Sequence, residues 1–177
     1  MTRYFLDTEF IEDGTTIDLI SIGVVDDTGR EFYAESSDVD LGRANDWVRE
    51  NVLPHLWHRQ AGANQRPANA WSRDGGVGGF LRRARIAVEL RDFVQRGVSP
   101  PEFWAYYADY DWVAICQLYG TMMDLPDGWP MFCMDLKQLA VMLGNPKLPI
   151  QEMTEHHALE DARWVHDTHR LLAGVHP

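Results

Sequence analysis

Residues 3–10, Arg3-Tyr-Phe-Leu-Asp-Thr-Glu-Phe10, form the stretch that decides the fold of this chain. Their aromatic and aliphatic side chains are typical of a strand at the centre of a sheet. Side chains two positions apart on a strand share a face about 7 Å apart, so Asp7 and Glu9 would project two carboxylates into one small region, with Thr8 facing the other way. Acids on a central strand are costly unless they are paired or bind a metal. Acids two positions apart on a strand more often form a solvated face. A functional role for Asp7 and Glu9 therefore needs support from elsewhere in the chain.

The segments after this strand predict a mixed α/β sheet with helices on both faces. Further strands are expected at residues 17–25, 30–35, 102–108 and 131–134, and helices at 46–53, around 86–97, at 111–123 and at 157–172. The first three strands form an antiparallel meander, and the alternation that follows indicates parallel strands, five in all. Residues 59–79 are rich in Gly, Asn and Ala without a period and predict a mobile surface loop. No repeat or second boundary divides residues 1–177, so a single domain is expected.

The composition is that of a soluble globular protein: 45% of the 177 residues are hydrophobic and 24% are charged. No apolar run approaches the ~20 residues of a membrane-spanning helix. Asp7 lies where the apolar stretch of a signal peptide would be, so we expect a cytoplasmic protein without a membrane partner. Cys116 and Cys133 lie in apolar sequence without CxxC spacing, which indicates core residues rather than a disulfide or a zinc site.

The charge balance restricts the class of partner. The chain has 16 basic and 27 acidic residues and a net charge of -11, whereas a protein that grips a long nucleic acid through its phosphates is normally basic. Either the partner is not a long polyanion or part of the acid binds metal ions. The one basic cluster is Arg82, Arg83 and Arg85. It is most simply a solvated helix start, although beside the glycine-rich loop it could guide a phosphate backbone.

Two more acidic regions follow later in the chain. Asp109 and Asp111 close the strand predicted at 102–108, at the start of a helix, where either could simply cap that helix. Asp161 lies in the first turns of the last helix, on the side of inward-facing small residues, where an acid needs a metal. His156 and His157 precede it. On a continuous helix His157, four residues from Asp161, would lie closer to it than His156 does.

Taken in order, these residues resemble the DEDDh group of DnaQ-like 3'-5' exonucleases. That group has D-x-E on the first strand, an aspartate after the fourth strand and H-x(4)-D near the C-terminus. More narrowly, the chain is similar to the actinobacterial exoribonuclease AS type in the following segments: Asp7-Thr-Glu-Phe-Ile-Glu-Asp-Gly14, Leu19-Ile-Ser-Ile-Gly-Val-Val25, Tyr110-Asp111 and His156-x-Ala-Leu-x-Asp161-Ala162. The family spacing favours His156 over His157, with His156 in a loop before the helix. It favours Asp111 over Asp109, because Ile115 matches the apolar position four residues later.

The resemblance implies an RNase H-like fold, a homodimer and a site in which Asp7, Glu9, Asp111 and Asp161 hold two divalent metal ions. Two ions roughly 3.5 to 4 Å apart can activate water and stabilise the leaving 3' oxygen of a phosphodiester. Oxygen ligands select Mg²⁺ or Mn²⁺ over zinc. Neutral His156 would accept the proton of the attacking water.

The expected activity is 3'-5' hydrolysis of single-stranded RNA or short oligoribonucleotides to nucleoside 5'-monophosphates. Thr8, Phe10 and Leu19 are candidates for contacts with the substrate, although Phe10 and Leu19 also fit the core. The preference for RNA rests on the resemblance, because the contact with a 2'-OH cannot be read from sequence. Two alternatives stay open at this point: a DNA exonuclease of the proofreading or repair type, and a catalytically silent RNase H-like nucleic-acid-binding module.

Overall fold

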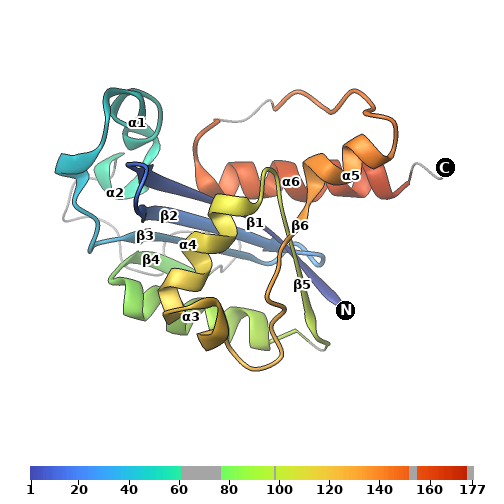
Figure 1. The fold of residues 1–177 in the computed structure, drawn as a ribbon, viewed down its shortest axis with the longest axis horizontal. Coiled ribbons are helices and arrows are strands. Elements are labelled where there is room, and N and C mark those ends of the chain that lie inside the picture. Colours follow the sequence, from blue (N-terminus) through green and yellow to red (C-terminus); the bar gives the residue numbers. More distant parts are fainter. Residues whose placement is uncertain (61–76, 98, 152–154, 175–177) are drawn as a thin grey trace.

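The computed structural model describes residues 1–60, 77–97, 99–151 and 155–174 (Figure 1). Its strands are β1 (Thr2–Glu12), β2 (Ile17–Asp26), β3 (Glu31–Ser36), β4 (Val77–Leu81), β5 (Pro101–Ala105) and β6 (Met134–Asp135). Its α-helices are α1 (Asp46–Asn51), α2 (Trp57–Gln60), α3 (Arg83–Gln95), α4 (Asp109–Tyr119), α5 (Leu136–Met142) and α6 (Ala158–Ala173). Short 3-10 turns occur at η1 (Leu41–Arg43), η2 (Leu53–His55) and η3 (Met122–Asp124). None of the helices in these ranges is both long and apolar enough to cross a membrane.

The strands form one mixed sheet in the order β4-β3-β2-β1-β5-β6. β1, β2 and β3 pair antiparallel, as predicted, whereas β5 pairs parallel to β1, β6 parallel to β5, and β4 parallel to β3. β1 therefore lies inside the sheet with a neighbour on each side. This position explains the apolar character of residues 4–6 and places Asp7 and Glu9 where solvent access is restricted.

The predicted number of five strands was wrong, because β4 begins within the glycine-rich stretch, residues 59–79, that was expected to be a loop. A Cβ atom on Gly78 would lie 1.5 Å from the carbonyl oxygen of Tyr33, so the glycine permits the close approach of β4 to β3. Glycine carries little strand propensity, which concealed this strand in the sequence. At its other end the predicted loop overlaps α2, and residues 61–76 lie outside the described part of the chain.

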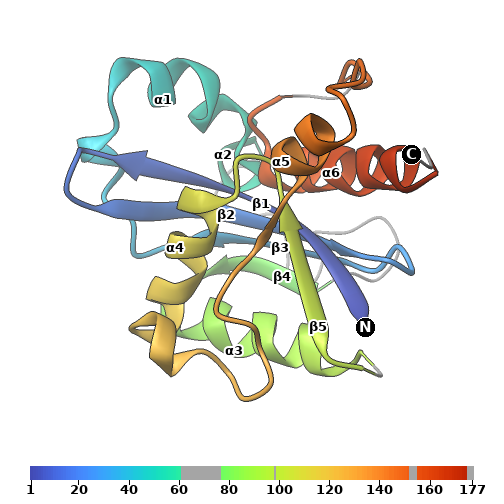
Figure 2. The same cartoon turned by 45° about the vertical axis from the view of Figure 1, so that its right-hand side comes forward.

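Helices cover both faces of the sheet, as expected (Figures 1 and 2). Alternate side chains of β1 point to opposite faces. Tyr4 and Leu6 pack in the core cluster that includes residues of α3 and α4, whereas Phe5 packs in the cluster that includes residues of α5 and α6. Asp7 and Glu9 share the parity of Phe5, so their carboxylates lie on the face that α6 covers.

The start of α6 is seated directly on β2. A Cβ atom on Gly23 would lie 2.3 Å from the carbonyl oxygen of Ala158 and 2.4 Å from the Cα atom of Leu159, so only a glycine fits here. Gly23 is also the residue of β2 that pairs with Asp7. The first turn of α6, and the residues just before it, are thereby held next to the acidic part of β1.

The turn between β5 and α4 shows why the predicted element ends moved by a few residues. Tyr107 has a φ of 60°, a left-handed conformation that a strand cannot continue, so β5 ends at Ala105 rather than at Ala108. The backbone N–H of Ala108 donates to Asp135 at 2.8 Å, and the same aspartate caps α5, a helix that the sequence analysis did not predict.

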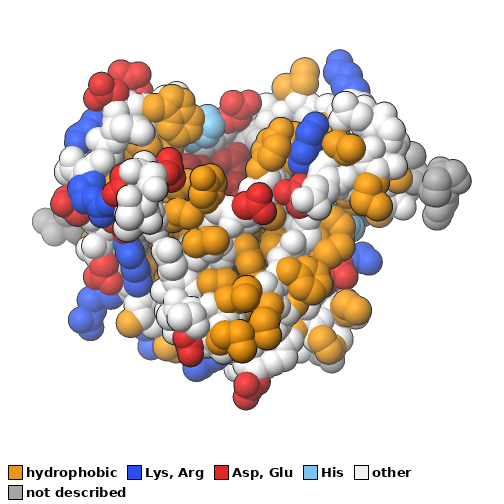
Figure 3. Space-filling model, in the orientation of Figure 1, with side chains coloured by type: hydrophobic (Ala, Val, Ile, Leu, Met, Phe, Trp, Pro, Cys, Tyr) orange, Lys and Arg blue, Asp and Glu red, His pale blue; other side chains and the backbone are white. Residues whose placement is uncertain are grey.

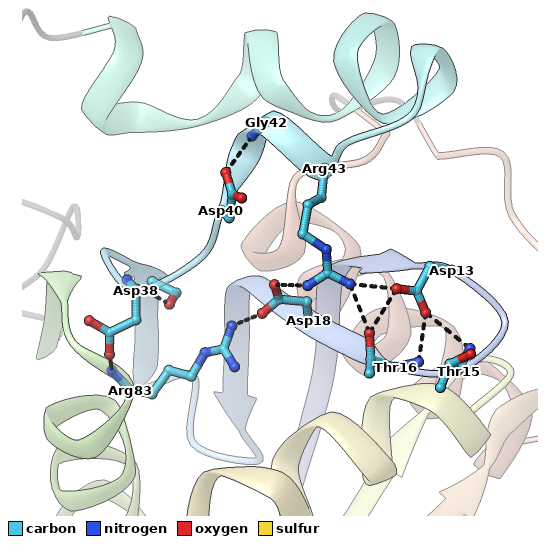
Figure 4. A network of polar contacts seen from close by, with 10 residues as sticks. Asp13, Thr15, Thr16, Asp18, Asp38, Asp40, Gly42, Arg43 and Arg83 are labelled. Atoms are coloured by element: carbon cyan, nitrogen blue, oxygen red, sulfur yellow. Dashed lines mark hydrogen bonds and ion pairs between the residues drawn. The ribbon is translucent and has the colours of Figure 1, made fainter.

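A polar network fastens the β1–β2 hairpin to η1 and α3 (Figure 4). Arg43 forms ion pairs with Asp13 and Asp18, and Arg83 forms an ion pair with the other oxygen of Asp18. Exposed pairs of this kind contribute little stability one by one, but a network fixes the positions of the elements that it joins. The guanidinium of Arg83 is therefore engaged within the protein, and Arg85 pairs with Glu89 on its own helix.

Candidate active site

The D-x-E stretch of β1 provides three polar side chains in the arrangement that its period predicts. Thr8 points away from Asp7 and Glu9 and donates from both its backbone N–H and its hydroxyl to Oδ1 of Asp111, at 2.9 and 2.6 Å. A β-bulge follows between Glu9 and Phe10 and ends the regular alternation at this point. Thr8 therefore positions a carboxylate of α4 and is itself almost fully buried, which does not favour the substrate contact expected for it.

Two helices bring the remaining carboxylates to this strand. Asp111, in the first turn of α4, is buried, whereas Asp109 two residues earlier is exposed. Asp161, in the first turn of α6, accepts a hydrogen bond from the side-chain amide of Gln151. Ligand atoms of Glu9, His156 and Asp161 all lie within 4.8 Å of one another. The chain thus gathers carboxylates from positions separated by about 150 residues of sequence at the end of one strand.

The two adjacent histidines have different environments. His156 lies in the turn before α6, with a φ of 64°, and faces Glu9 and Asp161. His157 is 5% exposed and stacks on the ring of Tyr33, with 4.7 Å between centroids and an interplanar angle of 15°. The ring of Trp57 contacts both His157, at 4.9 Å between centroids, and Tyr33, at 4.5 Å, so the three rings form one cluster. Because α6 begins only at Ala158, the helical spacing that favoured His157 does not apply.

Burial raises the pKa of each of the four carboxyl groups, and repulsion by neighbouring carboxylates adds to this shift at Asp7, Glu9 and Asp111. Burial is the largest cause in every case. The pKa of Asp7 is raised well above its ordinary value by burial and then by Asp111, Glu9 and Asp161, and that of Glu9 by burial and then by Asp161 and Asp111. The pKa of Asp111 is raised to about 7 although Thr8 opposes the shift. Such a set of acids is costly to ionise unless a cation enters.

The donor set fits divalent metal ions. Within the described ranges no Arg or Lys forms an ion pair with Asp7, Glu9, Asp111 or Asp161, so protein cations do not neutralise these carboxylates. Carboxylate oxygens are the ligands that Mg²⁺ and Mn²⁺ prefer, and the single imidazole beside them leaves no set of nitrogen or sulfur ligands for zinc.

The carboxylates lie at the bottom of a hollow in the surface. In Figure 3 acidic side chains gather in this hollow near the top of the face, with a histidine at its rim and hydrophobic side chains around it. Trp47 of α1 is 53% exposed, and its ring meets that of His156 edge-on with 4.8 Å between centroids. Aromatic rings at the rim of an acidic hollow are suited to a ligand that is both charged and planar.

Phe10 and Leu19, the other two candidates for contacts with the substrate, separate in the structure. Phe10 is half-buried and packs against the exposed ring of Tyr110 at 5.8 Å. Leu19 is 3% exposed and lies inside the core cluster. The ring of Phe10 is thus partly accessible, whereas Leu19 has a packing role.

The raised pKa values predict how the stability of the metal-free protein depends on pH. A carboxyl group whose pKa is higher in the folded than in the unfolded state favours folding at low pH, and this contribution is lost as the pH rises through the folded-state pKa. We therefore expect the Tm measured in EDTA to contain a component that falls between pH 5 and pH 8. Buried His157 and His169 have lowered pKa values and change the Tm in the opposite sense.

Comparison of wild type with Asp7→Asn isolates the carboxyl component, because the histidine contributions are common to both proteins. The Tm of the variant should exceed that of the wild type by several degrees at pH 8 and by less at pH 5, and added Mg²⁺ should raise only the wild-type value. A difference in Tm that did not change with pH would show that the pKa of Asp7 is not raised in the folded protein.

Comparison with known proteins places this chain in a family. Residues 2–171 match the 3'-5' exoribonuclease Rv2179c-like domain. This chain belongs to that family. Two Mycobacterium tuberculosis relatives, the 3'-5' exoribonuclease Rv2179c of strain H37Rv and the 3'-5' exoribonuclease MT2234.1 of strain CDC 1551, are each 44% identical to it over 162 residues, 91% of this chain and 87% of the relative.

The Rv2179c-like chain also has the RNase H-like nuclease fold. The solved structure of S. pombe Pop2p, in a form with Mg²⁺ and Mn²⁺ bound, matches it with a TM-score of 0.51. The match has 13% sequence identity and covers 97% of this chain and 82% of that chain. The family match and this structural similarity confirm the family and the fold expected from the sequence.

Several residues of the hollow were not found by sequence reasoning. Gln151, Trp47, Tyr106 and Trp164 reach the site only through tertiary packing. None of them belongs to a spacing pattern with the acids. The sequence offered one signal for these residues: Trp47 directly follows the polar helix start Asn45-Asp46, where a large aromatic side chain can be left exposed for a ligand.

Proposed function

We propose that this member of the Rv2179c-like family is a metal-dependent 3'-5' exoribonuclease that shortens single-stranded or short RNA from its 3' end and releases nucleoside 5'-monophosphates. The observation that carries the proposal is the convergence of four carboxylates, unpaired with any described cation, beside one accessible imidazole. The family match and the names of the M. tuberculosis relatives support RNA as the substrate. The net charge of -11 supports a grip on a few terminal nucleotides rather than on a long polyanion.

Asp7, Glu9, Asp111 and Asp161 would hold two divalent ions. When bound, such ions supply charge stabilisation for the attacking water and for the leaving 3' oxygen. The ions are expected to be Mg²⁺ or Mn²⁺, which oxygen ligands prefer; the Pop2p structure of the same fold was solved with both. Thr8 fixes the orientation of Asp111, and Gln151 fixes that of Asp161, so both carboxylates are positioned before a substrate arrives.

The protein residues then have separate roles in the hydrolysis. His156 accepts a proton from the attacking water as the new P–O bond forms. The bond between phosphorus and the 3' oxygen of the preceding nucleotide breaks, and the leaving oxygen takes a proton from solvent. Trp47 supports the edge of the His156 ring, and the turn before α6 sets the direction of this ring. The terminal nucleotide leaves with its 5'-phosphate.

His156→Ala is expected to lower kcat by about 100-fold or more, because general-base catalysis contributes about 100- to 10,000-fold. His157→Phe is the matched comparison. It preserves the aromatic contacts with Tyr33 and Trp57, so the folded variant should keep a rate within a few-fold of the wild type. Initial rates on one RNA oligomer, with the Tm of each variant, measure both effects. The opposite ranking of the two variants would move the general base to His157.

The reaction itself is tested with a single-stranded RNA labelled at its 5' end and its DNA counterpart. Each is incubated with Mg²⁺, with Mn²⁺ and with EDTA, and the products are resolved by length. The proposal requires a ladder that shortens from the 3' end of the RNA and is abolished by EDTA. Faster shortening of the DNA would favour the proofreading or repair type. The absence of cleavage in either metal, with the protein folded, would favour the silent binding module.

The homodimer and the cytoplasmic location stay predictions. Light scattering at several protein concentrations measures the first directly. A monomer at micromolar concentration would show that the family resemblance does not extend to the oligomeric state.

A further inference from the structure

A fully buried carboxylate lies two strands away from the acids of β1. Cross-strand pairs connect Glu9 of β1 to Ser21 of β2, and Ser21 to Glu35 of β3. Residues directly opposite one another on neighbouring strands point to the same face of a sheet, so Glu35 lies on the face that α6 covers. Its side chain has no contact with solvent. Glu35 is not among the described residues whose ligand atoms converge beside Glu9, so a metal ion does not explain its burial.

Four donors within the protein hold the Glu35 carboxylate. Oε1 accepts from the hydroxyl of Tyr33 and from the backbone N–H of Trp57, both at 2.6 Å. Oε2 accepts from the backbone N–H of His58 at 3.1 Å and pairs with Nδ1 of the same residue. Burial and then the charge of Glu35 raise the pKa of Tyr33 well above its ordinary value, so its hydroxyl keeps the proton that it donates. The carboxylate is fully partnered and fastens the first two residues of α2 to β3.

The rings that Glu35 fastens are those that hold His157. Within the described part of the chain neither ring nitrogen of His157 has a hydrogen-bond partner, and burial lowers its pKa, which keeps the ring neutral. Ring packing, at 4.7 Å from Tyr33 and 4.9 Å from Trp57, is therefore what fixes this side chain. Glu35 fixes both of those residues in turn, one through its hydroxyl and the other through its backbone N–H.

His156, the residue before this ring cluster, has a conformation that needs such support. Its φ of 64° is costly for a residue with a side chain and persists only where the surrounding structure imposes it. The close seat of Ala158 on Gly23 imposes it from one side of the turn, and the packing of His157 does so from the other. A shift of the ring cluster would therefore turn the imidazole of His156 away from the carboxylates.

We propose that Glu35 is a positioning residue for the general base His156. It holds the two rings that pack on His157, and His157 fixes the turn that aims the His156 ring. This inference rests on the role in the hydrolysis proposed for His156. Because Glu35 contacts neither the metal ligands nor the hollow, its replacement should lower kcat and leave KM and the affinity for metal ions close to their wild-type values.

A double-mutant cycle tests this path. Glu35→Gln keeps the shape of the side chain but replaces an acceptor oxygen by an NH2 group, so at least one of the four donors loses its partner. The values of kcat and KM on a single-stranded RNA oligomer are measured for the wild type, Glu35→Gln, His156→Ala and the double variant. Calorimetry measures the affinity of each protein for Mn²⁺.

We expect Glu35→Gln to lower kcat by about 10- to 100-fold when His156 is present, the range that a small misplacement of a reacting group can cost. When His156 is already alanine, the same change should lower kcat by less than about twofold, because the residue through which it acts is gone. Equal losses with and without His156 would overturn the inference even if the enzyme cleaves RNA. Weaker binding of Mn²⁺ to Glu35→Gln would also overturn it, since Glu35 would then act on the metal ligands.

Asp26→Asn is the matched control for loss of a buried carboxylate. Asp26 is also fully buried and also accepts from four donors, two in Thr28 and two in Arg30. It lies at the end of β2 that pairs with Tyr4, away from the row of Glu9. Its replacement should lower the Tm but keep kcat within about twofold of the wild type. A loss of kcat as large as that of Glu35→Gln would show a general effect of destabilisation and refute the positioning role.

Substitution of Trp57 keeps the test decisive if Glu35→Gln does not fold. Trp57→Leu and Trp57→Phe both keep the backbone N–H that donates to Glu35, and only the leucine removes the aromatic ring. We expect Trp57→Leu to lower kcat about tenfold, only when His156 is present, and Trp57→Phe to stay within a few-fold of the wild type. Equal rates for the two variants would refute the ring contact as the link. A His156→Ala protein as fast as the wild type would instead refute the proposed general base, and this inference with it.

Discussion

Turnover of single-stranded RNA is expected to fall by about 1000-fold or more when Asp7 is replaced by asparagine. Asp7 lies on the central strand, and burial together with Asp111, Glu9 and Asp161 raises its pKa. Asparagine keeps the size of the side chain but removes the negative charge that a divalent ion requires. Loss of several kcal/mol of transition-state stabilisation corresponds to this factor. Asp161→Asn should have a similar effect, because the carboxylate of Asp161, on α6, lies within 4.8 Å of that of Glu9 and belongs to the same cluster.

The control for both variants is Asp109→Asn. Asp109 carries the same charge two residues before Asp111, but it is exposed and lies outside the cluster. Its replacement should change the rate by less than about twofold. Initial rates at saturating Mg²⁺ are compared with the Tm of each metal-free protein, which should not fall in Asp7→Asn or Asp161→Asn. Rates close to wild type in either variant would show that the carboxylates are assigned to the wrong role.

Gly23→Val is expected to destabilise the protein by about 3 kcal/mol or more. The new Cβ would lie 2.3 Å from the carbonyl oxygen of Ala158 and 2.4 Å from Cα of Leu159, and both are backbone atoms that cannot rotate away. The start of α6 would have to lift off β2. His156 and Asp161 would move with it, so the folded fraction should also lose activity.

Urea unfolding measures this effect. Gly174→Ala is the matched control, since Gly174 has a φ of -83° and a Cβ there would make only ordinary contacts, the nearest at 3.5 Å. Alanine at this position should leave the free energy of unfolding unchanged or slightly raise it. A Gly23→Val protein as stable as the wild type would mean that α6 is not seated on β2 as described.

The parts of the fold that were predictable from sequence are those with a strong apolar signal. The aromatic and aliphatic side chains of residues 3–10 predicted a central strand, and the two-residue period of any strand placed Asp7 and Glu9 on one face, opposite Thr8. The run at residues 17–25 predicted its antiparallel partner. β4 was missed because its glycines, which let it approach Tyr33, are also what weakens a strand signal. α5 was missed because a seven-residue helix offers too few turns for an apolar period to appear.

The residues of the candidate site likewise include some that were predictable from sequence and some that were not. The acids could be proposed from ordered spacing and from the family resemblance. Helical periodicity alone would have selected His157, because it assumes that the helix already includes that residue; α6 begins one residue later. The contacts of Gln151 with Asp161 and of Trp47 with His156 join elements that no spacing relates. Such contacts depend on how α6 and α1 pack on the sheet, which only coordinates supply.

The central claim is that the four carboxylates form one two-ion site, and the most direct test is a crystal structure of the wild type with Mn²⁺. Anomalous scattering locates the ions without reference to activity. The account predicts two peaks about 3.5 to 4 Å apart, in contact with carboxylate oxygens of Asp7, Glu9, Asp111 and Asp161. It also predicts that Asp7→Asn loses at least one of these peaks. Full occupancy of Mn²⁺ elsewhere on the chain, with these four carboxylates free of metal, would contradict it.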